Sequence, residues 1–217
     1  MLIEVRDLTY RIGERTVLDL PAFTAERGEH TLLLGPSGSG KTTLINLLTG
    51  LRTPTTGEVK IDGQAMSSLS PGARDALRRR TIGLVFQTLQ LVSALSVRQN
   101  LALAQHLGLG RSFPGEVDEL IERVGLARRA DARPRELSQG EAQRAAIARA
   151  LCTRPAIVVA DEPTSALDDA NAQAMAELLL SSAAATGATL LIATHDTRMK
   201  RRFARTLELR PLMQAAA

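Results

Sequence analysis

A glycine-rich segment that directly follows a short apolar run constrains this chain more than any other feature. The apolar run covers residues 31–34 (TLLL), the glycine-rich segment covers residues 35–42 (GPSGSGKT), and an apolar helical pattern continues to residue 48. A strand that ends in such a turn, with a helix beginning after it, lets several backbone N–H groups point at one polyphosphate. The helix N-terminus adds free donors and the positive end of its dipole. The segment therefore predicts a nucleoside triphosphate site.

The residue types within this segment indicate separate roles. Lys41 is placed to reach the β- and γ-phosphates, and the Thr42 hydroxyl is placed to bind Mg²⁺. A chance match to the glycine spacing is rare in a chain of this length, and the strand–turn–helix context makes it rarer. The candidate phosphate-binding residues are Gly35, Pro36, Ser37, Gly38, Ser39, Gly40, Lys41, Thr42 and Thr43.

The composition fits a single core, with room for a small subdomain, and does not favour a nucleic-acid partner. Of the 217 residues, 44% are hydrophobic and 2% are aromatic, so Leu, Ile, Val and Ala must form the core. The 27 basic and 23 acidic residues leave a formal charge of +4. Because the basic residues are scattered and aromatic stacking platforms are nearly absent, we expect no nucleic-acid binding. An anionic membrane surface or an acidic protein partner explains the excess of basic residues equally well.

The N-terminal residues and the single cysteine favour the cytoplasm. Residues 1–7 carry charge too early for a signal peptide, and no apolar run approaches the ~18 residues of a membrane-spanning helix. Cys152 cannot form an internal disulfide, which agrees with a reducing compartment, and its Ala-rich surroundings predict a small buried residue. We expect a cytoplasmic protein that reaches a membrane only through a partner.

Apolar runs alternate with helical patterns along the chain, which is typical of a parallel α/β sheet. Four runs are typical of buried parallel strands, at residues 31–34, 82–86, 156–160 and 189–194. Shorter strands are predicted at residues 2–10, 15–23 and 57–63. The predicted helices include residues 116–124, 140–153 and 172–186. Residues 88–153 lack a convincing strand, so we expect a mostly helical insertion there.

Two carboxylates end the apolar run at residues 156–160. In a parallel sheet, ligands gather at the carboxyl ends of the strands. Asp161 is therefore placed to hold Mg²⁺ through its water shell, and Glu162 to polarise an attacking water. The alternative is an exposed acidic turn, but the preceding phosphate-binding loop favours the functional interpretation.

A second polar motif, residues 137–141 (LSQGE), opens a predicted helix 23 residues before Asp161. Ser138 with Glu141 three positions later forms the pattern of a capping box, which explains both residues structurally. The capping box explains neither Gly140 nor the spacing to Asp161.

Together these motifs resemble those of the ATP-binding-cassette (ABC) transporter ATPases, and the resemblance covers nearly the whole chain. Residues 137–141 match the family signature, and residues 161–164 match the segment with the magnesium ligand and the base. The loop 165–168 matches the one that carries an aspartate, here Asp168, across the dimer. Three single residues match the family as well. Tyr10 matches the aromatic residue that stacks on adenine, and Gln87 matches the glutamine that links Mg²⁺ and water to the helical subdomain. His195 matches the histidine that senses the γ-phosphate.

The resemblance implies a P-loop NTPase core with a mostly parallel sheet, an antiparallel β subdomain and an inserted α-helical subdomain. The core would comprise residues 1–87 and 154–217, and the helical subdomain residues 88–153. It also implies a head-to-tail homodimer that encloses two ATP molecules. The phosphate loop of one copy would face Ser138 and Gly140 of the other. Lys41, Gln87, Glu162 and His195 would then carry out ATP hydrolysis, with Thr42, Gln87 and Asp161 at the Mg²⁺.

One position departs from the family pattern. The family usually has glycine where this chain has Gln139. A larger side chain where the backbone approaches phosphate is expected to loosen closure, and we predict an active but slow ATPase.

Residues 63–103 resemble the lipoprotein-releasing and macrolide-efflux group, whose ATPases drive a separate membrane permease. The short stretch after His195 leaves no room for a regulatory domain, which agrees with that group. The apolar residues after Gln87 would together form a groove for a coupling helix of the permease, although each taken singly is better explained as core of the helical subdomain; these are Leu89, Leu91, Val92, Leu95 and Val97. A basic cluster is interpreted as a solvated helix face rather than a lipid contact; it comprises Arg198, Lys200, Arg201, Arg202 and Arg205.

Two other functions remain open from the sequence. One is a regulator of cell division or wall remodelling that signals through a membrane partner without transport. The other is an ATPase that handles nucleic acid or a metal-cluster scaffold without a membrane partner.

Overall fold

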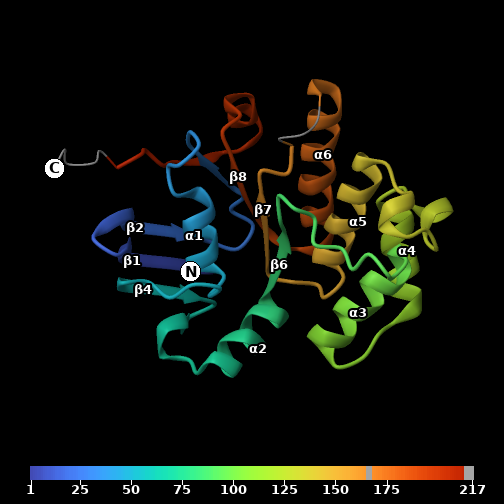
Figure 1. Cartoon of the computed structure of the whole chain (residues 1–217), viewed down its shortest axis with the longest axis horizontal. Helices are drawn as coiled ribbons and strands as arrows, with labels where there is room; N and C mark the ends of the chain where they lie inside the picture. The colour runs from blue at the N-terminus through green and yellow to red at the C-terminus, as the bar shows by residue number, and fades with distance from the viewer. Residues whose placement is uncertain (165–167, 213–217) are drawn as a thin grey trace.

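The structure, a computed structural model, describes residues 1–164 and 168–212. Two sheets lie beside each other with helix α1 (Lys41–Leu48) between them (Figure 1). Helices α5 and α6 cover the opposite face of the larger sheet, and α3 and α4 pack against α5. This is the α/β arrangement that the alternation of strands and helices predicts.

Five parallel strands form the larger sheet in the order β6-β7-β8-β3-β9. They are β3 (Thr31–Leu34), β6 (Ile82–Val85), β7 (Ile157–Asp161), β8 (Thr189–Thr194) and β9 (Arg205–Glu208). The four buried strands are predicted by the sequence. Strand β9 is not, because it is short, partly polar and paired only with β3 at the sheet edge. Parallel pairing brings the carboxyl ends of all five strands to one edge, where the residues that follow them meet.

The smaller sheet is antiparallel, with the order β2-β1-β4-β5. Its strands are β1 (Ile3–Ile12), β2 (Arg15–Ala25), β4 (Thr56–Ile61) and β5 (Gln64–Ala65). The first three of these strands overlap the predicted ones at residues 2–10, 15–23 and 57–63, and β5 is added at the edge.

The two faces of the parallel sheet pack into two different cores because successive side chains of a strand point to opposite faces. Leu33, Val159 and Leu191 pack with α1 and the antiparallel sheet. Residues one position away, Leu32 and Val158, pack with the helices on the other face. Both faces are buried, which explains why the four strands are near-continuous apolar runs.

Four of the five remaining α-helices in the described ranges begin at a side-chain cap, and α4 begins at a proline without one. The five are α2 (Pro71–Thr81), α3 (Val97–Leu109), α4 (Pro114–Arg123), α5 (Gln139–Leu151) and α6 (Asp169–Thr186). Short 3₁₀ helices are η1 (Met66–Ser68), η2 (Ala127–Arg129), η3 (Pro134–Glu136) and η4 (Thr197–Arg202). Helices α4, α5 and α6 correspond to predicted ones. Helices α2 and α3 are additional, although Ser70 before a proline and the Ser96–Gln99 capping box mark their starts.

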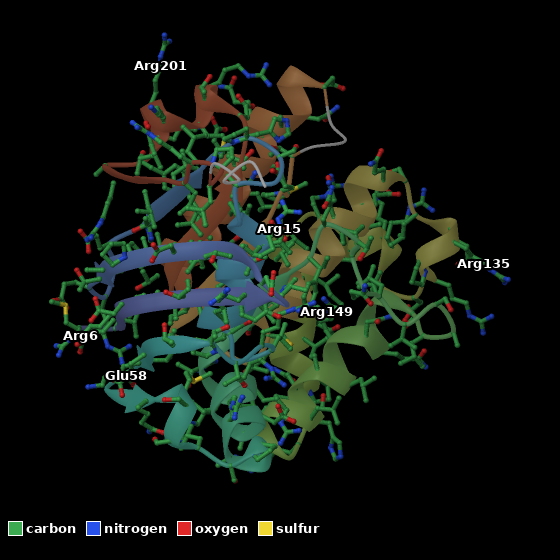
Figure 2. All side chains as sticks on the ribbon, turned by 60° about the vertical axis from the view of Figure 1, so that its left-hand side comes forward. Arg6, Arg15, Glu58, Arg135, Arg149 and Arg201 are labelled. Atoms are coloured by element: carbon green, nitrogen blue, oxygen red, sulfur yellow. The ribbon has the colours of Figure 1, made fainter. Side chains whose placement is uncertain are left out.

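The basic cluster lies on η4 and β9 and is largely paired with carboxylates. Lys200 contacts Glu208 at 2.5 Å, and Arg202 contacts Glu177 at 3.1 Å. Arg201 extends outward from the ribbon, as do Arg6 and Arg135 (Figure 2). These contacts agree with a solvated face. Within the described ranges, no helix has both the length and the apolar character that spanning a membrane requires.

Candidate functional site

The phosphate-binding loop connects β3 to α1, as the sequence predicts. Gly40 is the N-cap of α1 and has φ of 92°, a left-handed conformation that favours glycine. Gly35 has a different reason to be glycine, because a Cβ atom there would lie 2.4 Å from the backbone oxygen of Leu209. The loop therefore depends on a backbone shape that larger residues do not allow.

The Lys41 side chain folds back over this loop. Its Nζ donates to the backbone oxygens of Gly35 at 2.8 Å and Pro36 at 3.2 Å, and it lies 3.2 Å from Oε1 of Glu162. The Lys41 side chain is only 6% exposed, so its charge is poorly screened by water. This places a buried ammonium group between the loop and a carboxylate.

Thr42 and Asp161 meet although they are far apart in the sequence. The Thr42 hydroxyl donates to Oδ2 of Asp161 at 2.8 Å, and Oδ1 of Asp161 is buried with no hydrogen bond from the described residues. Burial raises the pKa of the Asp161 carboxyl; the Thr42 hydrogen bond lowers it, and the neighbouring Glu162 charge raises it further. A hydroxyl beside a carboxylate with a free oxygen is a donor set that suits Mg²⁺, which takes few protein oxygens and keeps several waters.

Glu162 lies at the centre of the site. Its φ is 49°, which is unusual for a residue other than glycine, and its backbone N–H donates to the oxygen of Ala193 at 2.8 Å. Its carboxylate accepts from the Thr194 hydroxyl at 3.3 Å and lies 3.0 Å from Nδ1 of His195. Because β7 and β8 are neighbours, the residues that follow them are brought together.

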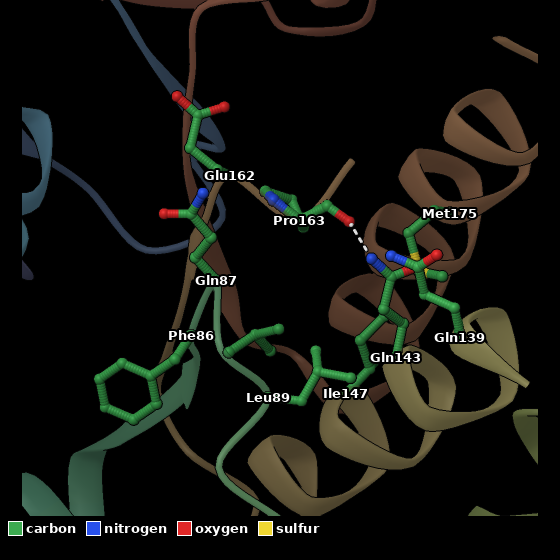
Figure 3. Close-up of a pocket in the computed structure, with 10 residues that line it drawn as sticks. Phe86, Gln87, Leu89, Gln139, Gln143, Ile147, Glu162, Pro163 and Met175 are labelled. Atoms are coloured by element: carbon green, nitrogen blue, oxygen red, sulfur yellow. Dashed lines mark hydrogen bonds between the residues drawn. The ribbon is translucent and has the colours of Figure 1, made fainter. Parts of the chain in front are cut away.

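An open pocket of about 480 Å³ joins these residues. It is lined by the loop and α1 residues Ser37, Gly38, Gly40, Lys41, Thr42 and Thr43, and by Gln87, Glu162 and His195. Gln87 follows β6 and also lines a smaller cavity behind the pocket (Figure 3). Most of the candidate residues for binding phosphate and for activating water thus share one pocket. Gly35 and Pro36 line a neighbouring pocket, and Ser39 and Asp161 are buried beside the loop.

Tyr10 does not line this pocket. Its hydroxyl accepts a hydrogen bond from Arg52 at 2.5 Å, and its ring packs against the core beneath the antiparallel sheet. The side chain of Ile12, two residues on, lines the pocket instead and is 58% exposed. Arg15 and Val17 of β2 accompany it. The sequence marks none of these three positions, because aliphatic and basic residues in a hairpin carry no distinctive pattern.

Three further candidate residues lie away from the pocket of their own chain. Ser138 caps α5: its hydroxyl accepts from Glu141 N at 3.3 Å, and Glu141 Oε2 accepts from Ser138 N at 2.8 Å, which forms the capping box expected from the sequence. Gly140 lies in the first turn of the same helix. Asp168 caps α6 by accepting from Asn171 N at 2.9 Å. The loop residues 165–167 before it lie outside the described part of the chain.

Comparison with known proteins agrees with this site. A family model described as ABC transporter matches residues 18–165, which is more than half of the chain. The chain belongs to the ABC transporter family and is an ATPase cassette of that family.

Solved structures support the same conclusion. The ATP-binding cassette MJ0796, in a dimeric post-hydrolysis state bound to ADP and Pi, is 33% identical with a TM-score of 0.86, and the match covers 95% of this chain and 94% of that one. A second dimeric structure, of MJ0796 as a bacterial ABC transporter cassette, is 33% identical, with a TM-score of 0.87 and coverage of 96% and 94%. CbiO1 from Clostridium perfringens, part of the CbiONQ transporter complex, is 28% identical, with a TM-score of 0.86 and coverage of 98% and 87%.

Proposed function

We propose that this chain binds MgATP, forms a head-to-tail homodimer around two ATP molecules, and uses ATP hydrolysis to drive a separate membrane permease. The observation that carries the proposal is the contact of Glu162 with both Lys41 and His195, at the mouth of a phosphate-binding loop.

The chemistry follows from the charges at this point. The γ-phosphate takes the position beside Lys41, whose ammonium group neutralises the negative charge that develops on the phosphoryl oxygens. Glu162 accepts a proton from the attacking water while the bond between the γ-phosphorus and the ADP oxygen breaks. His195 and Thr194 hold the Glu162 carboxylate, and Gln87 reaches the same pocket from β6.

Thr42 and Asp161 would hold Mg²⁺, and Gln87 would complete the site. The bound cation would neutralise charge on the phosphate oxygens. Oδ1 of Asp161, which accepts no hydrogen bond from the described residues, and the Thr42 hydroxyl next to it support this assignment.

The dimer is proposed because the signature residues face away from their own ATP pocket. Ser138 and Gly140 sit at the N-terminus of α5, where free N–H groups and the positive end of the dipole suit an anionic phosphate. A second copy would bring that helix end to the pocket of the first. The MJ0796 cassettes, which are similar over nearly their whole length, are dimeric.

Complementation tests the dimer. Lys41→Ala and Ser138→Arg should each abolish hydrolysis alone. A mixture should recover activity, because a heterodimer contains one site with an intact Lys41 from one copy and an intact Ser138 from the other. No recovery, while both variants remain folded, would contradict shared sites.

The membrane permease is proposed from the family and from exposed apolar residues after Gln87. The segment 88–153, which includes α3, α4 and α5, would form the helical subdomain, and residues 1–87 and 154–217 the nucleotide-binding core. Val92 is 44% exposed, whereas Val97 is 1% exposed and belongs to the core. The chain would then work at the cytoplasmic face of the membrane, in a system similar to the lipoprotein-releasing and macrolide-efflux group.

Co-purification from detergent extracts tests the permease. A protein with membrane-spanning helices should accompany the wild type, and Val92→Asp should release it. Leu107→Asp is the matched control, because Leu107 is also exposed (58%) but lies near the C-terminal end of α3. Retention by Val92→Asp would argue against this docking surface. The absence of any membrane protein would favour a soluble ATPase, and a partner without transport activity would favour the signalling alternative.

A further inference from the structure

We propose that Gln143 on helix α5 is a positioning residue for Glu162: its side-chain amide holds the backbone immediately after the carboxylate that activates water. The proposal rests on the role given to Glu162 above.

The contact is direct and buried. Nε2 of Gln143 donates to the backbone oxygen of Pro163 at 3.0 Å, and the Gln143 side chain is 7% exposed. Pro163 follows Glu162 directly and is itself buried. Figure 3 shows the bond reaching from α5 across to the strand-end segment that carries Glu162.

The backbone at this point depends on such support. Glu162 has φ of 49°, a conformation that persists only when the surrounding structure fixes it. Its own N–H is held by Ala193 of β8. Because proline has no N–H, the carbonyl is the one backbone polar group through which Pro163 can be held. Gln143 supplies this second hydrogen bond to the segment, from helix α5.

Helix α5 also holds the other wall of the pocket. Arg149 donates to the backbone oxygen of Gln90 and, at 3.5 Å, to that of Leu84. These two carbonyls flank the segment that carries Gln87. A small shift of α5 would therefore move both Glu162 and Gln87, and Gln143 would be the part of this connection that acts on Glu162.

A small cavity of about 50 Å³ lies beside the Gln143 amide, lined by Gln87, Glu162 and Gln139 among others. Oε1 of Gln143 is buried there and accepts no hydrogen bond from the described residues. The Gln139 side chain extends toward the Gln143 amide and Met175 (Figure 3). Among the described residues, the Gln143 amide therefore makes its hydrogen bond to the segment that carries Glu162 through Nε2 and not through Oε1.

Gln105 provides a matched control. Its Nε2 donates to the backbone oxygen of Cys152 at 3.0 Å, and its side chain is 1% exposed. This bond is equally buried and links α3 to the end of α5, and Gln105 Oε1 also accepts from Phe113 N at 2.8 Å. Its acceptor residue, Cys152, adjoins no residue of the nucleotide pocket, whereas Pro163 follows Glu162 directly. A purely structural role for Gln143 predicts that the two glutamines behave alike.

The experiment compares Gln143→Leu with Gln105→Leu. Both substitutions remove the amide donor and put an apolar side chain of similar size in its place. Gln143→Leu should lower kcat about 10-fold to 100-fold, since small misplacements of a reacting group have effects of that order. Its KM for ATP should stay within about twofold of the wild-type value, because the phosphate contacts remain. Gln105→Leu should lower the melting temperature and leave kcat near the wild-type value.

A second variant gives a readout that a loss of stability does not produce. Gln143→Glu can donate to the Pro163 oxygen only when its carboxyl is protonated. Its kcat relative to the wild type should therefore rise as the pH falls. A wild-type kcat in Gln143→Leu, or a flat ratio across pH in Gln143→Glu, would overturn the proposal.

The controls separate this inference from the proposed function. If Glu162→Gln retains hydrolysis, the role of Glu162 is wrong, and the premise fails. If Glu162→Gln is inactive and Gln143→Leu is fully active, only the positioning role is wrong.

Discussion

The contact between Lys41 and Glu162 makes a specific prediction for Glu162→Gln. The two side chains are 3.2 Å apart and only 6% and 12% exposed. A γ-phosphate oxygen must replace Glu162 beside the ammonium group, so the carboxylate competes with ATP. A hydrogen bond to a charged group contributes about 1.5–3 kcal/mol to stability. Removing the competing charge should tighten ATP binding by about 2 kcal/mol, or about 30-fold.

The same change should remove catalysis. Loss of a general base lowers rates by roughly 10²-fold to 10⁴-fold. Glu162→Gln should thus bind ATP more tightly than the wild type while failing to hydrolyse it, and with MgATP it should elute as a dimer in size-exclusion chromatography.

The assay is equilibrium binding of ATP in the presence of a chelator, at protein concentrations that keep the chain monomeric. His195→Ala is the control, because it removes a contact of Glu162 at 3.0 Å and leaves the contact with Lys41 in place. It should lose activity without any gain in affinity. Equal affinities for the wild type and Glu162→Gln would refute the competition between Glu162 and ATP. A monomer with MgATP would contradict the dimer.

Three further predictions concern the rest of the molecule. Ile12→Ala should raise the ATP dissociation constant about fivefold, since Ile12 lines the pocket and about 1 kcal/mol of apolar burial against the nucleotide is lost; an unchanged affinity would contradict that contact, and Tyr10→Leu in the same binding titration tests the adenine stacking predicted for Tyr10. Gly83→Ala should destabilise the fold by about 3 kcal/mol in urea denaturation, because its Cβ would lie 2.1 Å from the backbone oxygen of Ala150; an unchanged midpoint would be inconsistent with this packing. Burial raises the pKa of the Cys152 thiol to about 12, so iodoacetamide at pH 8 should label Cys152 only after denaturation, as mass spectrometry can measure, and rapid labelling of the native protein would contradict that burial.

Several features of the site follow from local sequence alone. The loop at residues 35–42 is predicted because its glycines, the strand before it and the helix after it are consecutive in the chain. The Ser138–Glu141 capping box is predicted for the same reason, since both partners lie within one helical turn. The carboxylates at the end of β7 are recognisable because the apolar run stops there.

The hairpin beside the phosphate-binding loop shows where counting along the chain is insufficient. Tyr10 pairs with Leu18 and Arg11 pairs with Thr16, which leaves Val17 of β2 as an extra residue in the ladder. Such a bulge bends the strand that contains it and changes where its side chains point. Val17 lines the pocket together with Ile12, and this pairing is a property of the folded sheet. The adenine contact of Tyr10 stays a prediction.

The sequence by itself determines the elements that are local: the phosphate-binding loop, the buried strands, and the helix caps. Tertiary structure alone decides which of these elements become neighbours. The strand order brings His195 to Glu162 and Thr42 to Asp161, and the packing of α5 against the sheet brings Gln143 to Pro163. These contacts join residues from different elements, and they form only when burial of the two cores fixes the relative positions of those elements.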